Sequence, residues 1–115
     1  MSVTPFEQLA NLDRRVHDPA RLAILTALSA CERADFLYLQ RITGLTKGNL
    51  SSHLSKLEEA GLVEIEKGFV GKKTQTLVRL SGDGRRTLDS YWQEMEDLRA
   101  SAARWQTQKL VPVLS

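Results

Sequence analysis

The sequence predicts a mainly α-helical domain that contains one small β-hairpin. Capping residues, two of them followed by proline, mark four helix starts before residue 61, and apolar residues follow each start at helical spacing. Between residues 62 and 80 the chain instead has short runs rich in branched residues, and the helical period returns from residue 81. We therefore expect four helices, a hairpin and one long helix, in that order.

Length and composition favour one folded domain over residues 1–115. The chain has 115 residues, which is too short for a separate catalytic or ligand-binding domain beside the first one. Hydrophobic residues make up 42% and charged residues 26%, which argues against a mainly disordered chain. No apolar run approaches the roughly 20 residues that cross a bilayer. Residues 1–7 also lack the features of a signal peptide. We expect a cytoplasmic protein with no membrane partner.

The sequence offers little for metal or covalent chemistry. Its single cysteine, Cys31, has no partner for an internal disulfide and is expected to pack in the core. The two histidines, His17 and His53, form no recognisable zinc-binding spacing with it. No set of nucleophile, base and acid is visible, and no glycine-rich phosphate loop appears. The expected protein is therefore not an enzyme and has no metal or cofactor.

The first two helices each begin with a capping residue and a proline. Thr4 can cap the first helix and Pro5 suits its first position, so we expect a helix within residues 1–16. Asp18 and Pro19 repeat the arrangement at the start of the second helix. The leucines that follow at helical spacing indicate that this second helix is mostly buried.

The third and fourth helices flank a short glycine turn. Asp35 can cap the third helix, and Gly44 ends it because glycine adopts a left-handed conformation with little strain. Thr46 then caps a fourth helix, which is expected to run to about Ala60 and to stop at Gly61. The pattern is helix, tight turn, helix.

The remaining residues predict a hairpin and a long terminal helix. Strands are expected over residues 62–67 and 74–80, with a loop over residues 68–73 between them. The last helix is expected over residues 82–109, and its apolar residues alternate between spacings of three and four. Gly82 and Gly84 disfavour a firm helix start, so we expect this helix to begin loosely.

Charge is distributed unevenly along the chain. The net charge is only +2, but residues 41–86 hold 9 basic and 5 acidic side chains, a local excess of +4. Residues 1–40 hold 4 basic and 5 acidic side chains, and residues 87–115 hold 3 basic and 4 acidic ones. Such an excess is also typical of an ordinary solvated surface, so it supports nucleic-acid binding only together with a suitable motif.

The fourth helix has a face suited to the DNA major groove. Leu50, Leu54 and Leu57 share one side and are expected to pack inward. The opposite side carries mainly small polar residues, which permit a close approach and offer donors to base edges and phosphates. The alternative is a capped surface helix whose polarity is accidental. The candidate DNA-binding residues of this helix are Thr46, Lys47, Asn49, Ser51, Ser52, His53, Ser55 and Lys56.

Two interpretations of His53 stay open. At helical spacing it lies at the edge between the inward face and the polar face. It is either a half-buried imidazole with a hydrogen bond inside the chain, or a contact to a phosphate or a base.

The tip of the hairpin is expected to be a second DNA-binding element. Lys72 and Lys73, with Thr74 beside them, can neutralise phosphates along the neighbouring minor groove. Glu64 and Glu66 on the first strand are expected to point away from DNA, so the contact is limited to the tip. The alternative is that the two lysines only keep a strand edge soluble.

Apolar stripes on both terminal helices predict a homodimer. A helix of roughly 28 residues would extend about 42 Å, which exceeds the breadth of a small domain, so its stripe needs a partner. The alternative is that the terminal helix folds back on its own domain. The candidate dimerisation residues are Phe6, Leu9, Leu12, Leu88, Tyr91, Met95, Leu98, Ala102 and Trp105.

Several segments resemble the MarR and ArsR type of winged helix-turn-helix regulators. They are DPARLAIL at residues 18–25, GLTKGNLSSHL at 44–54 and KLEEAGLV at 56–63, and the wing EIEKGFVGKKT at 64–74 resembles that of their minimal single-domain members. The likeness extends from about residue 18 to 90. It implies a winged helix with N- and C-terminal dimerisation helices, and a homodimeric prokaryotic transcription regulator that binds specific double-stranded DNA. It places DNA contacts on Lys47, Asn49, Ser51 and Ser52 and on a basic wing tip.

The resemblance supplies no small-molecule effector. Metal-sensing ArsR members carry a cysteine pair in the helix before the turn, whereas this chain has Asp35, Phe36 and Leu37 there. Metal sensing of that kind is not expected. A protein-interaction module without DNA specificity is the alternative function, because the fold alone does not dictate DNA binding. The basic tip and the small polar face favour DNA.

Overall fold

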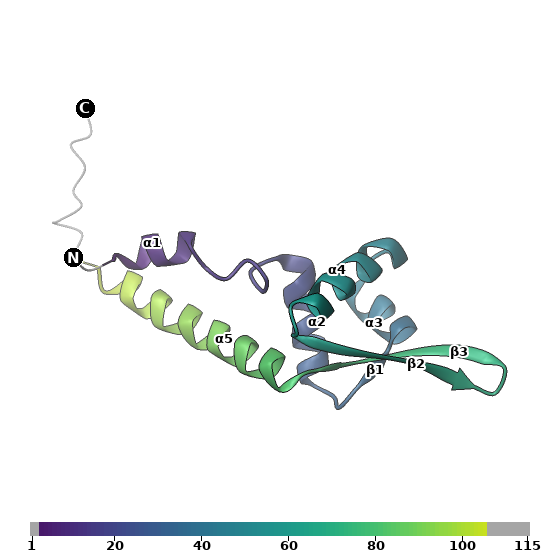
Figure 1. Cartoon of the computed structure of the whole chain (residues 1–115). Helices are drawn as coiled ribbons and strands as arrows, with labels where there is room; N and C mark the ends of the chain where they lie inside the picture. The colour runs from purple at the N-terminus through teal and green to yellow at the C-terminus, as the bar shows by residue number, and fades with distance from the viewer. Residues whose placement is uncertain (1–2, 106–115) are drawn as a thin grey trace.

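The computed structural model describes residues 3–105 and shows an elongated molecule, 68 × 29 × 22 Å in extent. A group of helices lies near the middle, the hairpin projects from it at one end, and the long last helix extends in the other direction beside the first helix (Figure 1). The helices are α1 (Pro5–Ala10), α2 (Pro19–Ser29), α3 (Phe36–Thr43), α4 (Lys47–Glu59) and α5 (Gly82–Ala103), and the strands are β1 (Ala34–Asp35), β2 (Val63–Val70) and β3 (Lys73–Leu80).

The predicted helix starts are confirmed at atomic level. The side chains of Thr4, Asp18, Asp35 and Thr46 each accept a hydrogen bond from the backbone N–H three residues later. Gly44 ends α3 with a φ of 72°, as its left-handed role requires. These starts and stops depend on local sequence, which is why the sequence alone was sufficient to locate them.

Helix α1 is shorter than the predicted 1–16 segment. It ends at Ala10, and the Asn11 amide donates a 2.8 Å hydrogen bond back to the Glu7 carbonyl. The Asp13 carboxylate then accepts hydrogen bonds from the backbone and the guanidinium of Arg15. Such side-chain bonds to nearby backbone compete with helix continuation.

The strands form an antiparallel sheet in the order β1–β3–β2. The predicted loop over residues 68–73 is wrong, because β2 continues to Val70 and β3 begins at Lys73. Only Gly71 and Lys72 connect them, and the φ of 63° at Gly71 suits a type II′ turn, whose twist matches that of the strands. Strand β1 was not predicted, since a two-residue strand depends on its partner rather than on a pattern of its own.

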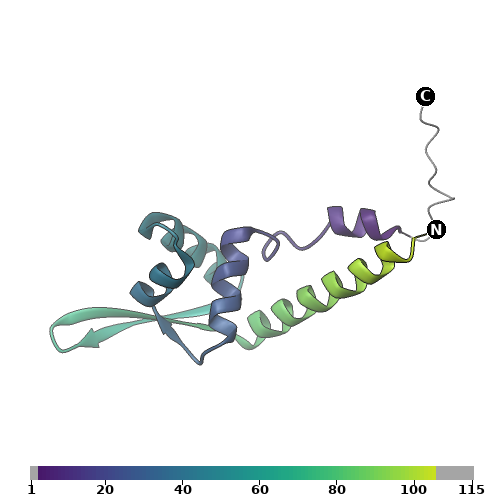
Figure 2. The same cartoon turned by 180° about the vertical axis from the view of Figure 1, so that it is seen from behind.

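The core lies where α2, α3, α4 and the base of the sheet meet. Figure 2 shows α2 standing between the start of α5 and the pair α3 and α4. Leu50, Leu54 and Leu57 are buried, which confirms the predicted inward face of α4. Cys31 is partly buried and packs against this core as expected.

Helix α5 begins firmly rather than loosely. The Ser81 hydroxyl accepts from the Gly84 N–H at 2.8 Å and donates to the Gly61 carbonyl at 2.6 Å. Gly84 is buried against the backbone of Leu62, and a Cβ at this position would lie 2.8 Å from the Leu62 carbonyl carbon. The glycine that suggested a loose start is therefore required by close packing.

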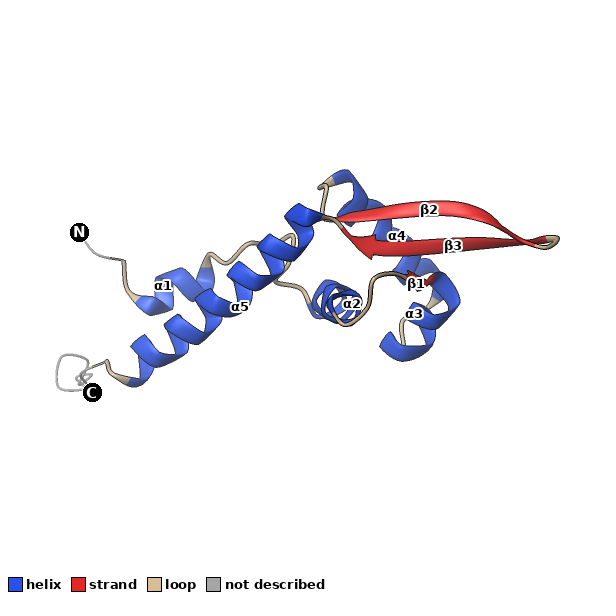
Figure 3. Ribbon diagram, turned by 90° about the horizontal axis from the view of Figure 1, so that it is seen from below, coloured by secondary structure: helices blue, strands red, loops and turns tan. Residues whose placement is uncertain are grey.

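The apolar stripes expected on the two terminal segments are partly covered within the chain. Helices α1 and α5 lie side by side (Figure 3). The side chains of Leu12, Leu88, Tyr91 and Leu98 are buried within the chain, so the expectation that they need a partner chain is wrong for these four. Helix α5 ends at Ala103, and residues 106–109 of the predicted helix lie outside the described residues.

We predict opposite outcomes for alanine at the two glycines that begin α5. Gly84→Ala should lower the free energy of unfolding by about 1–3 kcal/mol or more, because the new methyl group overlaps the Leu62 carbonyl. Gly82→Ala should stay within about 1 kcal/mol of wild type, since the nearest atoms to its Cβ belong to the Arg86 guanidinium at ordinary contact distances. Urea unfolding of both variants measures the difference, and equal stability would contradict the packing argument.

Candidate nucleic-acid interface

The exposed face of α4 gathers most of the predicted DNA-binding residues. The Thr46 hydroxyl caps the helix by accepting from the Asn49 N–H at 3.1 Å, and the buried leucines fix which side turns outward. The exposed side chains along this helix include those of Lys47, Asn49, Ser51, Ser52, Ser55 and Lys56. The small side chains leave the helix backbone open to close approach.

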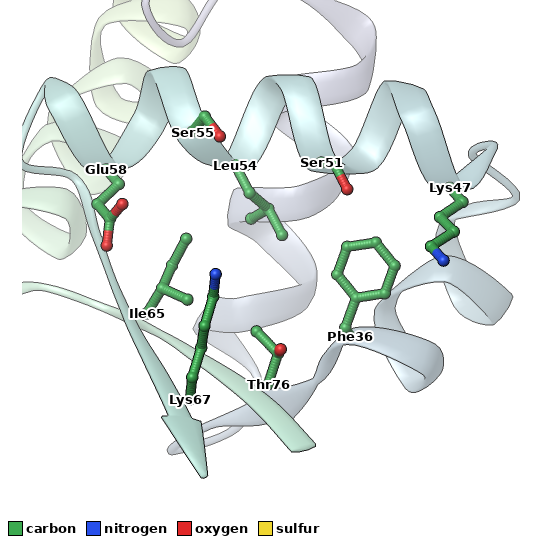
Figure 4. Close-up of a pocket in the computed structure, with 9 residues that line it drawn as sticks. All are labelled: Phe36, Lys47, Ser51, Leu54, Ser55, Glu58, Ile65, Lys67 and Thr76. Atoms are coloured by element: carbon green, nitrogen blue, oxygen red, sulfur yellow. The ribbon is translucent and has the colours of Figure 1, made fainter. Parts of the chain in front are cut away.

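A groove of about 690 Å³ runs between α4 and the base of the hairpin. Its residues are Phe36, Lys47, Ser51, Leu54, Ser55, Glu58, Ile65, Lys67 and Thr76 (Figure 4). The side chains of Leu54, Ile65 and Phe36 make the apolar part, while hydroxyl groups line both walls. Two lysines contribute positive charge from opposite sides, and one carboxylate, that of Glu58, lies at the far end from Lys47.

Lys67 and Thr76 are groove residues that the sequence reasoning missed. They pair across β2 and β3, on the same face as the pair Ile65 and Val78 that packs towards the helices. In Figure 4 the Lys67 amine points towards α4. The period of two along a strand would have placed Lys67 on this face, but the expected strand stopped at this residue and its pairing partner was unknown.

The register divides the wing residues, those of β2, β3 and their turn, between two faces. Phe69 and Thr74 pair on the α4 side, whereas Val70 and Lys73 pair on the opposite side.

Glu64 and Glu66 also lie on the side turned away from α4. Arg79 pairs with Glu64 through a 2.9 Å ion pair on that side. Lys72 occupies the turn itself and is exposed.

His53 has a hydrogen-bond partner within the chain. Arg21 Nε donates to His53 Nδ1 at 3.2 Å, which connects the start of α2 to the middle of α4, and the imidazole is half-buried. The Asp18 carboxylate accepts from the Arg21 backbone N–H at 3.0 Å. That hydrogen bond lowers the pKa of Asp18 despite its partial desolvation, and the nearby His53 and Arg21 lower it further. The arrangement gives His53 a structural role, and any DNA contact falls to its other ring nitrogen.

Neither a metal centre nor a membrane segment is found in the part of the chain that the structure describes. Across residues 3–105 no three His, Cys, Asp or Glu side chains are grouped as a metal ion would require. None of the helices in this range combines the length and the apolar character needed to span a bilayer.

A family model described as the winged helix DNA-binding domain matches residues 20–98. The chain belongs to this family. The match runs from α2 into α5, so it includes α4, the groove and the whole wing. The winged helix-turn-helix fold predicted from the sequence is thereby confirmed, and the protein is a winged-helix DNA-binding protein.

Two relatives with similar sequences accord with this assignment. An uncharacterized protein of Methanocaldococcus jannaschii is 37% identical over 78 residues, which cover 68% of this chain and 85% of the relative. The HTH-type transcriptional regulator YgaV of Escherichia coli strain K12 is 36% identical over 61 residues, which cover 53% of this chain and 62% of that regulator.

Solved structures of transcriptional regulators share the winged-helix architecture. The transcriptional regulator homologue from Pyrococcus horikoshii OT3 superposes with a TM-score of 0.75 at 25% identity, covering 84% of this chain and 94% of that one. A MarR-family transcriptional regulator from Silicibacter pomeroyi gives a TM-score of 0.60 at 26% identity, covering 86% and 61%. The MarR-type resemblance seen in the sequence is confirmed.

Proposed function

We propose that this protein regulates transcription by binding specific double-stranded DNA sequences as a homodimer. The observation that carries the proposal is the exposed polar face of α4 beside a groove with lysines on both walls. The Escherichia coli relative and the two similar structures are named as transcriptional regulators, which supports a regulatory role.

In the proposed complex, α4 enters the major groove and a phosphate strand passes through the groove between α4 and the hairpin. Lys47 and Lys67 would neutralise phosphates from the two walls, releasing counterions. The hydroxyls of Ser51, Ser55 and Thr76 can donate to phosphate oxygens. The Glu58 carboxylate repels phosphate, so the strand is expected to cross nearer the Lys47 end of the groove.

Base reading is proposed for the outward residues in the first turns of α4. The Asn49 side chain is exposed, and its amide can make paired hydrogen bonds to adenine in the major groove. Ser52 and Lys56 follow on the same helix at helical spacing and are also exposed. Since these side chains are not needed to bury the core, they are free to serve recognition.

The proposed dimer uses the outer face of the α1–α5 pair. Leu9, Trp92, Met95 and Ala102 line an apolar groove of about 490 Å³, which Glu96 and Arg99 border. Trp92 is 46% exposed, and Phe6 stacks edge-on with Trp105 at 5.4 Å nearby. A two-fold pairing of this face would cover these side chains and set two α4 helices for half-sites about 34 Å apart or a multiple of that distance.

Lysine substitutions test the phosphate contacts. Lys67→Ala, and the double variant Lys72→Ala with Lys73→Ala, should weaken binding to specific and random duplexes by the same factor. Each lost phosphate contact should reduce the salt slope by about 1. Arg79→Ala is the matched control, because Arg79 lies at the base of the hairpin, away from its tip, and already pairs with Glu64, so its slope should match wild type. If the lysine variants keep the DNA affinity and the salt slope of wild type, the wing and this groove wall are not part of the DNA interface.

Asn49→Ala tests base recognition. The substitution should cost about 1–3 kcal/mol on the best-bound sequence and relax the preference at one or two base pairs. Its urea midpoint should equal that of wild type because the side chain is exposed. Selection from a random duplex library measures the preference, and a loss that is equal for all sequences would place Asn49 on the phosphate backbone instead.

Trp92→Glu tests the dimer face. The variant should sediment as a monomer at micromolar concentration, where wild type sediments as a dimer, and it should lose more affinity for the specific site than for random DNA. Trp92→Phe, which keeps an apolar ring, should remain dimeric. Leu98→Glu is unsuitable because Leu98 is buried and its loss would disturb folding. Sedimentation equilibrium of wild type as a monomer, without DNA, would overturn the homodimer.

A further inference from the structure

The tip of the wing carries an exposed phenylalanine ring that takes no part in the hydrophobic core. Phe69 is 76% exposed, the highest value among the large apolar side chains of residues 3–105, and its neighbour Val70 is 60% exposed. An exposed phenylalanine forgoes the favourable burial that a partner surface would give it. Residues 67–76 around it hold three lysines and no acidic residue, so the expected partner is a polyanion.

The strand register directs this ring to the same side as α4. Phe69 pairs with Thr74 on the face that carries Lys67, whereas Val70 and Lys73 lie on the reverse face. Along β2, Ile65 is the last residue of this face that packs against the core. Four residues further on, the ring of Phe69 stands about 13 Å beyond that point, at about 3.3 Å per residue.

This extension of about 13 Å exceeds the distance from one DNA groove to the next, so it is long enough to pass one phosphate strand. The major groove is about 12 Å wide and the minor groove about 6 Å wide, so their centres lie roughly 9 Å apart across one phosphate strand. In the proposed complex, with α4 in the major groove and that strand between α4 and the hairpin, the wing tip would reach the adjacent minor groove. The ring would then face the edges of base pairs rather than solvent.

We propose that Phe69 is an apolar wedge that enters this minor groove, partly unstacks one base step and bends the duplex. The inference rests on the proposed DNA-binding function. Phenylalanine and leucine serve as such wedges, which open the minor groove and kink the duplex towards the major groove by about 20–90°. Pyrimidine–purine steps unstack most easily, so the wedge selects a flexible step at a fixed distance from the bases that α4 reads.

The test uses full-length protein and an end-labelled duplex of the best-bound sequence. Energy transfer between the duplex ends should report a bend with wild type. Phe69→Ala should lose most of the bend and bind roughly tenfold more weakly, with an unchanged salt slope because no phosphate contact is lost. Phe69→Leu should keep both bend and affinity. Val70→Ala is the matched control, since Val70 is exposed on the other face of the same strand, and it should behave as wild type.

The outcomes separate this inference from the function on which it rests. If wild type binds no duplex, both the proposed function and the proposed role of Phe69 are wrong. If wild type binds but Phe69→Ala binds and bends DNA equally well, only the wedge is overturned. A change in the sedimentation mass of Phe69→Ala without DNA would assign the ring to a protein contact and would also overturn the wedge.

Discussion

The backbone of Leu62 connects the three parts of the molecule on which the proposed function depends. Its N–H donates to the Leu57 carbonyl at the end of α4, and its carbonyl accepts from Ser81 N–H at the end of β3. The same carbonyl packs against Gly84 in the first turn of α5, at a separation that only a residue without a Cβ permits. Helix α4, the wing and helix α5 therefore leave one junction with fixed relative directions.

This junction gives the proposed mechanism its geometry. Because β2 begins at Val63, directly after the junction, the direction of the hairpin relative to α4 is set before the sheet leaves the core. The direction of the hairpin in turn determines how the two walls of the groove face each other. Lys47 lies on one wall and Lys67 on the other. Helix α5 starts at the same place, so a dimer built on its outer face would transmit its two-fold symmetry directly to the two copies of α4.

Local chemistry explains why much of the fold could be predicted from the sequence. Thr46 caps α4 and Gly44 ends α3 through atoms within a few residues, and the leucine face of α4 follows from helical periodicity alone. Strand β1, the two-residue turn at Gly71 and the packing of Gly84 depend on partners distant in the sequence or on a register. The packing of α5 against α1 likewise depends on the tertiary structure, which the apolar stripes alone could not reveal.

The candidate site divides in the same way. Asn49 and Ser52 could be proposed from one helix, but Lys67 belongs to the site only because the pairing of β2 with β3 turns it towards α4. Across residues 3–105 the buried side chains are apolar, with none that is polar or charged. The proposed DNA contacts therefore lie outside the core, so substitutions there can alter sequence preference at little cost in stability. Gly84 has no such freedom, because a Cβ there would overlap the Leu62 carbonyl at the junction that joins α4, the wing and α5.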